Sequence, residues 1–483
     1  MIFKAFLTNS MGILCSRIFG FLRDLCMASF LGAGVASDIF FVAFKLPNLF
    51  RRIFAEGAFV QSFLPSFVDT RKKGAFSVII FCVFFAFIFL LSLCVWQFSG
   101  IFTKALANGF SDSQIELAKP IVAINFWYLE LIFCATFFGS LLQYKNCFWV
   151  SAYNTALLNI CMIIALFVAR DNEDLQAVYM LSYGVLCGGV AQVMLHFYPL
   201  LKFGFFKVFY VGVREIIQSL KVRKSNPSKL DFILRDVKSF FKQFFPALLG
   251  SSTAQIASFL DTLIASFLSA GAISYLYYAN RIFQLPLAIF AIAASSALFP
   301  TIAKAVKNAQ DSQALRLMRR AFWLLFIVLC VCVIGGIMLR NEIIWLLFER
   351  GKFLREDTLE VALVFAGYMV GLLPFGLARI FSLWLYAHKM QGKAAKISAI
   401  SLLCGVLFSL LLMRPFGASG LALASSLGGI IYFALTIRIF GVKEFLNMLK
   451  NLKGWLLLVI IALCEIALLG VFQKYEYVFG ISL

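Results

Sequence analysis

The sequence predicts an all-α polytopic membrane protein, with two parallel six-helix repeats around a central cavity and one or more C-terminal helices, giving 13–14 spans. Three observations predict this fold class. First, the 483-residue chain is 62% hydrophobic and only 14% charged, with a mean hydropathy of +0.93, which is too apolar for a soluble protein of this size. Second, the apolar residues form long runs, which are typical of membrane-spanning helices. Third, the two halves share a repeat.

The apolar runs define thirteen predicted spans in chain order. The first stretch is interrupted by Arg17, Arg23 and Asp24, so we expect no cleavable signal peptide. The spans cover residues 8–31, 38–67, 76–102, 117–143, 149–169, 176–198, 243–268, 275–302, 321–339, 361–386, 397–413, 417–437 and 454–472.

Basic residues orient these spans. When the N-terminus is placed in the cytoplasm, the cytoplasmic loops receive far more Lys and Arg than the outer loops, including a dense group between Lys202 and Lys242. This asymmetry is the usual topology signal. It also explains the net charge of +20 without a nucleic-acid partner. With thirteen spans the C-terminus lies outside, and a missed span would reverse that.

Cysteine and histidine usage predicts neither a metal site nor a cofactor. The twelve cysteines are scattered through the spans without a CxxC pair, and the chain has only two histidines. We interpret the cysteines as small apolar residues that fill space between helices.

A repeat links the two halves. Residues 24–37, DLCMASFLGAGVAS, and 261–274, DTLIASFLSAGAIS, match at eight of fourteen positions without a gap. Six predicted spans separate the copies, so both have the same orientation, as in transporters built from parallel repeats. The predicted domains are an N-terminal lobe over 1–200, a cytoplasmic amphipathic linker over 201–238, a C-terminal lobe over 239–440 and an additional membrane segment over 441–483.

Charged residues inside the spans are the candidate site. A charge at the bilayer centre costs at least about 2.5–3.5 kcal/mol, so each must face water, pair with another charge or reach an interface. The predicted substrate-binding residues are Arg17, Arg23, Asp24, Asp38, Arg51, Arg52, Glu56 and Arg281, and further cavity candidates are Lys45, Asp261 and Arg379.

Several of these residues could instead have purely structural roles. Arg17 and Asp24 are seven residues apart, so they share a helix face and could form a structural salt bridge. Asp38 could be a helix N-cap, and Arg52 could pair with Glu56 at the cytoplasmic interface. The long second span, about 45 Å as a straight helix, offers Pro47 and Gly57 as places to bend or break. The excess of arginine predicts an anionic substrate.

The segments RIFGFLRD (17–24), GAGVASDIFFVAFKLPNLFRRIFAEGAF (32–59) and YYANRIFQLP (277–286) resemble the signature segments of the MurJ (MviN) family. These are bacterial lipid II flippases of the multidrug/oligosaccharidyl-lipid/polysaccharide exporter superfamily. The resemblance implies two lobes around a V-shaped cavity, with C-terminal helices forming a groove for the lipid tail. It also implies transport of the undecaprenyl-pyrophosphate-linked peptidoglycan precursor to the periplasmic leaflet of the inner membrane by alternating access.

The resemblance carries cavity roles over to Arg17, Arg23, Arg52 and Arg281, and acidic roles to Asp38 and Glu56. It implies lipid II and membrane lipids as partners, a monomer, and a membrane potential or ion gradient as the energy source. One departure is that the family usually has fourteen spans. The short tail after Phe472 therefore puts the lipid-tail groove and the side of the C-terminus in question.

Three rival functions are weighed against this one. A multidrug or cation exporter would need carboxylates and aromatic residues instead of an arginine-lined cavity. A flippase for another lipid-linked oligosaccharide shares the same physics, and only the motifs argue against it. A membrane enzyme would need catalytic acids in a large outer loop. The largest predicted outer loop, 340–360, has nearly balanced charges, and we interpret it as a solvated loop.

Overall fold

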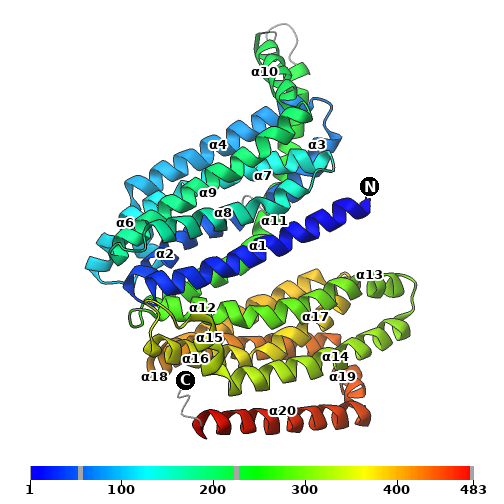
Figure 1. Ribbon diagram of the computed structural model, residues 1–483. Coiled ribbons are helices and arrows are strands. Elements are labelled where there is room, and N and C mark those ends of the chain that lie inside the picture. The colour runs from blue at the N-terminus through cyan, green and yellow to red at the C-terminus, as the bar shows by residue number, and fades with distance from the viewer. Residues whose placement is uncertain (1, 53–57, 222–227, 479–483) are drawn as a thin grey trace. The chain divides into compact units, whose positions relative to one another are not determined.

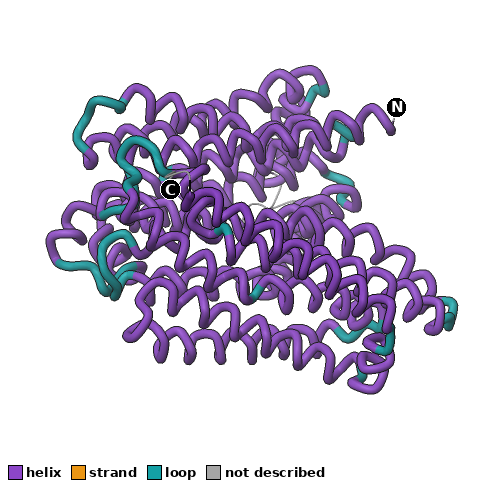
Figure 2. Tube along the Cα trace, turned by 60° about the horizontal axis from the view of Figure 1, so that its bottom comes forward, coloured by secondary structure: helices purple, strands orange, loops and turns teal. Residues whose placement is uncertain are grey.

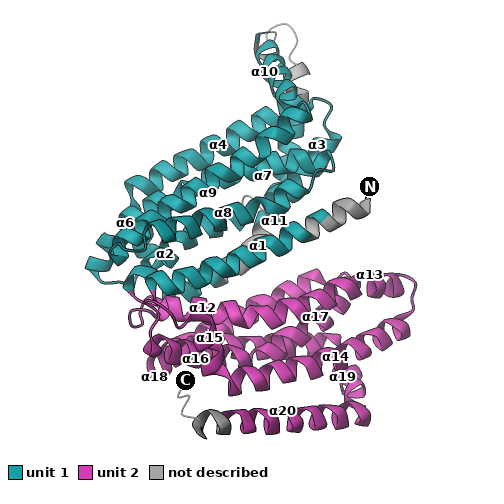
Figure 3. Ribbon diagram, viewed as in Figure 1, with its two compact units in different colours: residues 1–31, 35–263 teal, residues 32–34, 264–483 magenta. Residues whose placement is uncertain are grey.

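The computed structural model of the chain describes residues 2–52, 58–221 and 228–478. All regular secondary structure in these residues is helical (Figures 1 and 2). The helices form two compact units. Unit 1 comprises residues 1–31 and 35–263, and unit 2 comprises residues 32–34 and 264–483 (Figure 3).

Unit 1 holds the first eleven helices. The first five are α1 (Ile2–Leu31), α2 (Val35–Phe50), α3 (Ala58–Asp69), α4 (Lys73–Gln97) and α5 (Ser99–Leu106). They are followed by α6 (Asp112–Phe126), α7 (Tyr128–Tyr144), α8 (Trp149–Val168), α9 (Asp174–Lys202), α10 (Phe205–Lys221) and α11 (Ser228–Ala265). Helix α8 packs against both α1 and α9 (Figure 1).

Unit 2 holds the remaining helices. They begin with α12 (Ala272–Pro286), the π-helical segment η2 (Leu287–Ile292), α13 (Ala293–Lys307), α14 (Asp311–Met338) and α15 (Arg340–Phe348). They end with α16 (Arg355–Val370), α17 (Leu372–Ala387), α18 (Gln391–Phe440), α19 (Val442–Leu449) and α20 (Leu452–Val478).

Each of the thirteen predicted spans coincides with helix in the described residues. Nine helical stretches there are long and apolar enough to cross a membrane. The predicted spans 397–413 and 417–437 both lie in α18, where Gly417 leaves helical geometry (φ 55°, ψ −133°) and separates two helices. The predicted segments 8–31, 38–67 and 243–268 are not among the nine, so the total number of spans stays a prediction.

Two sequence-based expectations need correction. Helix α2 runs through Pro47 and ends at Phe50, where two π-helical residues follow, so the helix does not break at Pro47; Gly57, the other expected position, lies outside the described residues. The predicted outer loop 340–360 is largely ordered as helix, because α15 occupies its first half. Ile344 and Phe348 anchor that helix, since both side chains are fully buried.

The domain boundaries 200, 238 and 440 stay a prediction, but α11 shows why the linker is hard to delimit. This helix of 38 residues joins the end of the predicted linker to the first span of the second half without a break. Its first part belongs to the core of unit 1, where Phe240 packs on Phe59 and Phe84 with ring centroids 6.0 Å apart in each pair.

The predicted amphipathic linker contains helix α10, which packs against α4. The approach is close at Gly74 and Gly212, where a Cβ on Gly212 would lie 2.3 Å from the Gly74 carbonyl carbon. Only glycine allows this contact. Tyr210 and Ile217 of α10 remain exposed beside the charged Lys207 and Arg214. This exposed mixture of apolar and basic residues fits a helix lying on an anionic membrane surface.

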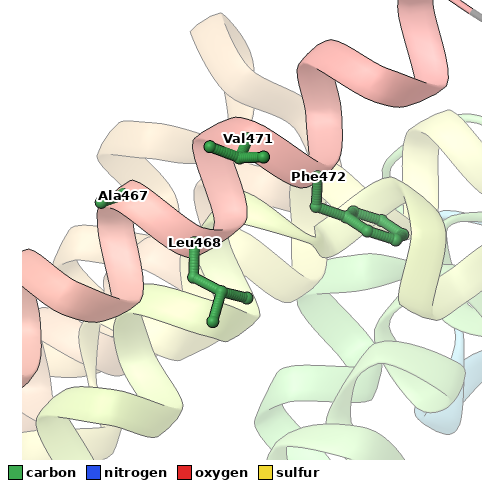
Figure 4. Close-up of a pocket in the computed structure, with 4 residues that line it drawn as sticks. All are labelled: Ala467, Leu468, Val471 and Phe472. Carbon is green, nitrogen blue, oxygen red and sulfur yellow. The ribbon is translucent and has the colours of Figure 1, made fainter.

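The last helix of unit 2, α20, is held against α14 toward both of its ends, and near its C-terminal end Gln473 Nε2 donates to the Met338 carbonyl at 2.8 Å. A Cβ on Gly454 would lie 2.5 Å from the Trp323 ring of α14, and the Trp323 Nε1–H donates to the Met448 carbonyl at 3.0 Å. Further along α20, four apolar residues line an open groove, namely Ala467, Leu468, Val471 and Phe472 (Figure 4).

The predicted repeat is reflected in the helix boundaries. An offset of 237 residues maps Val35, where α2 begins, onto Ala272, where α12 begins. The turn before each helix contains a glycine with positive φ, Gly32 at 65° and Gly271 at 91°, a conformation that glycine adopts without strain. The two copies thus form the same helix–turn–helix unit.

Candidate functional site

Arg23 and Asp24 form a buried ion pair in unit 1. Arg23 is 6% exposed and Asp24 is 1% exposed. The Arg23 Nη2 and Nε atoms donate to Asp24 Oδ1 at 2.6 and 3.1 Å. Arg23 Nη1 donates to the Oδ1 of Asn159 on α8 at 3.0 Å. The pair therefore joins α1 to α8 in the interior of the unit.

Small residues on α1 bring α8 close enough for this pairing. Gly12, Ser16 and Gly20 recur every four residues and form a stripe along α1. Ser16 Oγ donates to the Ala152 carbonyl at 2.8 Å, and a Cβ on Gly12 would lie 2.7 Å from the Ala152 Cβ. Such small-residue stripes are typical of close helix packing in membranes. The four-residue spacing of these small residues is a signal in the sequence that could have predicted the contact.

The predicted Arg17–Asp24 pair is not formed, although the structure describes both residues. Asp24 binds its neighbour Arg23 instead, because the long arginine side chain can curl back to the adjacent carboxylate. Arg17 lies on the exposed face of α1, between the exposed Leu14 and Ile18. A cation on this face needs water, a phosphate or another anion beside it.

Asp38 is 3% exposed and lies in the first turn of α2. Because α2 begins at Val35, Asp38 lies within the helix, and the alternative of an N-cap at this position is wrong. Its side chain is buried, as is that of the neighbouring Ser37.

A second group of charges joins α2 to α11. Lys45 of α2 is half-buried and interacts electrostatically with Asp261 of α11, which attracts it, and with Arg52, which repels it. Lys45 lies in α2, and Arg52 follows seven residues later, in the π-helical turn just beyond the end of that helix. Asp261 and Arg52 are both exposed. This group is accessible, in contrast to the Arg23–Asp24 pair.

Two further predicted residues, Arg51 and Glu56, follow α2 in the chain. Arg51 is half-buried and, like Arg52, lies in the π-helical turn after Phe50. Glu56 lies outside the described residues, so the expected Arg52–Glu56 pair stays a prediction.

Arg281 of α12 is partly buried in unit 2 and is held by Tyr277, one turn earlier. The Arg281 Nη2 donates to the Tyr277 hydroxyl at 2.9 Å, and its guanidinium carbon lies 5.1 Å from the centre of the same ring. A cation–π contact of this kind fixes the side chain without neutralising its charge. Tyr277 was missed in the sequence analysis, although its spacing of four residues from Arg281 was a usable signal.

Arg379 of α17 is exposed, whereas its neighbours in the chain, Ala378 and Ile380, are buried. Its accessible position keeps it among the cavity candidates. Among the residues that the structure describes, no group of three or more His, Cys, Asp or Glu side chains could hold a metal ion.

The charges thus divide into two kinds. Arg23, Asp24 and Asp38 are buried within unit 1, where Arg23 and Asp24 pair with each other. Arg17, Arg52, Asp261 and Arg379 are exposed, and Lys45, Arg51 and Arg281 are partly exposed. The exposed and partly exposed arginines can bind an anionic group, because a guanidinium stays ionised and offers a fork of donors to phosphate.

Comparison with known proteins shows which family the chain belongs to. The profile of the family described as lipid II flippase MurJ matches residues 27–483. A Helicobacter pylori (strain J99) protein named probable lipid II flippase MurJ is 55% identical over 453 residues, covering 93% of this chain and 97% of that protein. A Buchnera aphidicola (subsp. Baizongia pistaciae) protein with the same name is 32% identical, covering 92% of this chain and 84% of that protein.

Solved structures share the fold. A structure described as lipid II flippase MurJ in an inward closed conformation has a TM-score of 0.76 at 24% identity, covering 98% of this chain and all of that one. An inward-facing multidrug resistance MATE family transporter has a TM-score of 0.67 at 13% identity, covering 92% of this chain and 99% of that one. These structural matches establish the fold, while the sequence matches establish the family. The chain belongs to the lipid II flippase MurJ family.

Proposed function

We propose that this chain is a lipid II flippase that moves the undecaprenyl-pyrophosphate-linked peptidoglycan precursor from the cytoplasmic to the periplasmic leaflet by alternating access. The observation that carries the proposal is the family match along residues 27–483, together with 55% identity to a protein of that name. The membrane is the bacterial inner membrane, and the N-terminus lies in the cytoplasm. The activity is transport, and it uses no cofactor. A membrane potential or an ion gradient supplies the energy.

Lipid II poses a specific physical problem, since its pyrophosphate must cross a medium in which unpaired charge is costly. The negative charge of the pyrophosphate is balanced by three arginines that bind it directly, namely Arg17, Arg52 and Arg281. Their exposed or partly exposed positions support this role. Tyr277 supports it further, because it orients the Arg281 guanidinium before any substrate arrives. A preoriented donor loses less conformational freedom on binding.

The buried charged residues do not bind the substrate themselves but position the residues that do. Arg23 and Asp24 hold α1 against α8 and thereby position Arg17, which lies less than two turns away on α1. Asp38 fixes the start of α2, the helix that carries Lys45 and leads into Arg51 and Arg52. Lys45 and Asp261 balance each other's charge beside Arg52, and Glu56 completes the group as a partner for Arg52.

Complementation tests the function. The host flippase is depleted in a bacterium, and this chain is expressed as the wild type or as Arg52→Ala, Arg281→Ala or Arg17→Ala at matched membrane levels. Growth is expected with the wild type and is expected to fail with the variants. Arg170→Ala is the matched control, because Arg170 is an exposed arginine just beyond α8 and should rescue fully. Rescue by all three variants would place the pyrophosphate site elsewhere.

The outcome also separates the alternative substrates. If well-expressed wild type fails to rescue, a flippase for another lipid-linked oligosaccharide becomes the better reading, since it would use the same arginines. Drug export gains little support, because the multidrug transporters that share the fold are only about half as similar in sequence as the solved MurJ structure, at 13% against 24% identity.

A further inference from the structure

Glu130 is a buried acid that the proposed transport mechanism does not use. It lies in α7, near the middle of the membrane-spanning stretch Asp112–Tyr144. The residue is 7% exposed. Neither of its carboxyl oxygens has a hydrogen-bond partner among the described residues. It thus differs from Asp24, which is also buried but accepts hydrogen bonds from Arg23.

The surroundings of Glu130 are apolar. Phe133, Cys134 and Phe137 follow at the spacing that places them on the same face of α7, and both phenylalanines are fully buried. The Phe133 ring packs edge-on against Phe59 and stacks on Phe84, with centroids 5.5 and 5.6 Å apart. Aromatic rings from α3 and α4 therefore cover this side of α7 and exclude water.

Other elements also pack against α7, and they bring no counter-charge to Glu130. Cys134, on α7 itself, is the described titratable group that interacts electrostatically with the Glu130 carboxyl. The ionisable side chains on the neighbouring helices act elsewhere. They include Lys45, Arg51 and Arg52 at α2, Asp69 on α3, Lys73, Cys82 and Cys94 on α4, Glu116 and Lys119 on α6, Cys161 on α8, and Asp174, Cys187, His196 and Lys202 on α9.

Two physical effects compete over the charge of this carboxyl. Removing a carboxylate from water without a partner is among the costliest changes in a protein interior, and such a group neutralises by taking a proton. The start of α7 favours negative charge, but the helix-terminus effect is much weaker than the loss of hydration. The loss of hydration therefore outweighs the helix-terminus effect and favours the protonated, neutral form of the carboxyl.

A backbone irregularity lies beside this acid. The Trp127 amide donates to the Ile124 carbonyl at 3.3 Å, and the Glu130 amide donates to the Trp127 carbonyl at 3.2 Å. Both hydrogen bonds reach back three residues instead of four. A tight turn of this kind inside a longer helical stretch often marks a hinge. Bending at Trp127 would move Glu130 relative to the rings that cover it.

We propose that Glu130 is a proton-binding site inside unit 1, which holds its proton in the conformation described here and exchanges it when the α6–α7 junction bends and admits water. The step is a simple one, in which a carboxylate and a proton from water combine to a carboxylic acid. The proposal goes beyond the proposed function by adding a place for an ion to act.

Infrared spectroscopy on the purified full-length chain in lipid nanodiscs tests the proton site directly. A glutamic acid in water loses its proton with a pKa of about 4.3, so a protonated-carboxyl C=O band at neutral pH must come from a shielded group. We expect this band in the wild type, a shift in D₂O, and a negative C=O component in the difference spectrum of Glu130→Gln minus wild type. The matched control is Glu116→Gln, an exposed acid paired with Lys119, which should keep the band.

The absence of the band in the wild type, or identical bands in the wild type and in Glu130→Gln, would overturn the proposal. If Glu130→Gln does not fold, Glu130→Asp retains the acid and should show the band at a shifted frequency. An unshifted band in this variant would equally contradict the assignment.

Flipping assays then test the exchange, and this arm rests on the proposed function. With lipid II in proteoliposomes, the wild-type rate should change severalfold across neutral pH, while Glu130→Gln should give a rate that no longer follows pH. A flat wild-type profile would overturn proton exchange during transport while leaving the infrared result intact. Loss of all flipping by the wild type would instead count against the proposed function.

Discussion

Asp24 and Asp261 occupy the same position in the two copies of the repeat, yet their surroundings differ. Asp24 follows Arg23, is 1% exposed and accepts a 2.6 Å hydrogen bond from it. Asp261 follows Leu260, is exposed and interacts electrostatically with Lys45. The repeat thus reproduces the helix–turn–helix backbone while the residue before the aspartate decides the role of its carboxylate. In the first copy it stabilises packing, and in the second it balances an accessible cation.

The largest expected effect comes from breaking the buried pair. Asp24→Ala leaves the Arg23 guanidinium buried without its carboxylate, and such a change costs about 3–5 kcal/mol. We expect a large loss of stability, measured as the free energy of unfolding of the purified chain in detergent or nanodiscs.

The double variant Arg23→Met/Asp24→Leu is the control for that prediction. Replacing both charges with apolar residues of similar volume is often neutral, or stabilising by about 1–4 kcal/mol. Recovery of most of the lost stability would identify the effect as an uncompensated charge. If the double variant is as unstable as Asp24→Ala, packing and not charge dominates at this position.

A smaller loss of stability is expected at Asn159 of α8, which binds Arg23 of the buried pair. Asn159→Ala removes the acceptor for Arg23 Nη1, and a hydrogen bond to a charged group contributes about 1.5–3 kcal/mol. The unfolding free energy should fall by about that amount. In the Arg23→Met/Asp24→Leu background the same substitution should cost clearly less, and equal costs in both backgrounds would show that the bond to Arg23 is not the cause.

Substitution in the small-residue stripe of α1 should lower the free energy of unfolding by about 1–3 kcal/mol, because an added methyl group overpacks a tight contact. Gly12→Ala places a Cβ 2.7 Å from the Ala152 Cβ, which forces α1 and α8 apart. Gly470→Ala in α20 is the matched control, since a Cβ there meets no atom within 4 Å. Thermal unfolding of both variants checks this, and an equal change in the two would contradict close packing at Gly12.

The smallest effect on stability is expected at the second copy. Asp261→Asn changes an exposed side chain, and substitutions at such positions usually alter stability by about 0.5 kcal/mol or less. Its effect should appear in substrate handling, because Lys45 and Arg52 lose their neighbouring anion. A stability loss comparable to that of Asp24→Ala would remove the distinction between the two copies.

Much of the fold could be predicted from the sequence, because long apolar runs and the repeat are strong local signals. Every predicted span coincides with helix, and the offset of 237 residues aligns the starts of α2 and α12. The environment of each charge could not be predicted in the same way. Helical spacing suggested Arg17 as the partner of Asp24, but a distant residue, Asn159 of α8, completes the pairing of Arg23. Nothing local indicates which helix will supply such a partner.

The tight turn at Trp127 and the helix over 340–348 escaped prediction for a related reason. Apolar residues continue through 117–143, so the sequence gives no sign of the two hydrogen bonds that reach back three residues instead of four. The mixed charges of 340–360 suggested solvent, while the burial of Ile344 and Phe348 by the rest of unit 2 determines the helix. Tertiary packing decides both features.

The central claim is that the exposed and partly exposed arginines hold the pyrophosphate while the buried pair maintains the packing. The most direct test is the affinity of purified, folded protein for lipid II, compared between Arg52→Ala and Arg23→Met/Asp24→Leu. A lost bidentate contact to phosphate is expected to weaken binding by about tenfold or more for Arg52→Ala, since each 1.4 kcal/mol corresponds to tenfold. The double variant should bind as the wild type does. Wild-type affinity in Arg52→Ala, combined with lost binding in the double variant, would contradict the account and place the pyrophosphate at the buried pair.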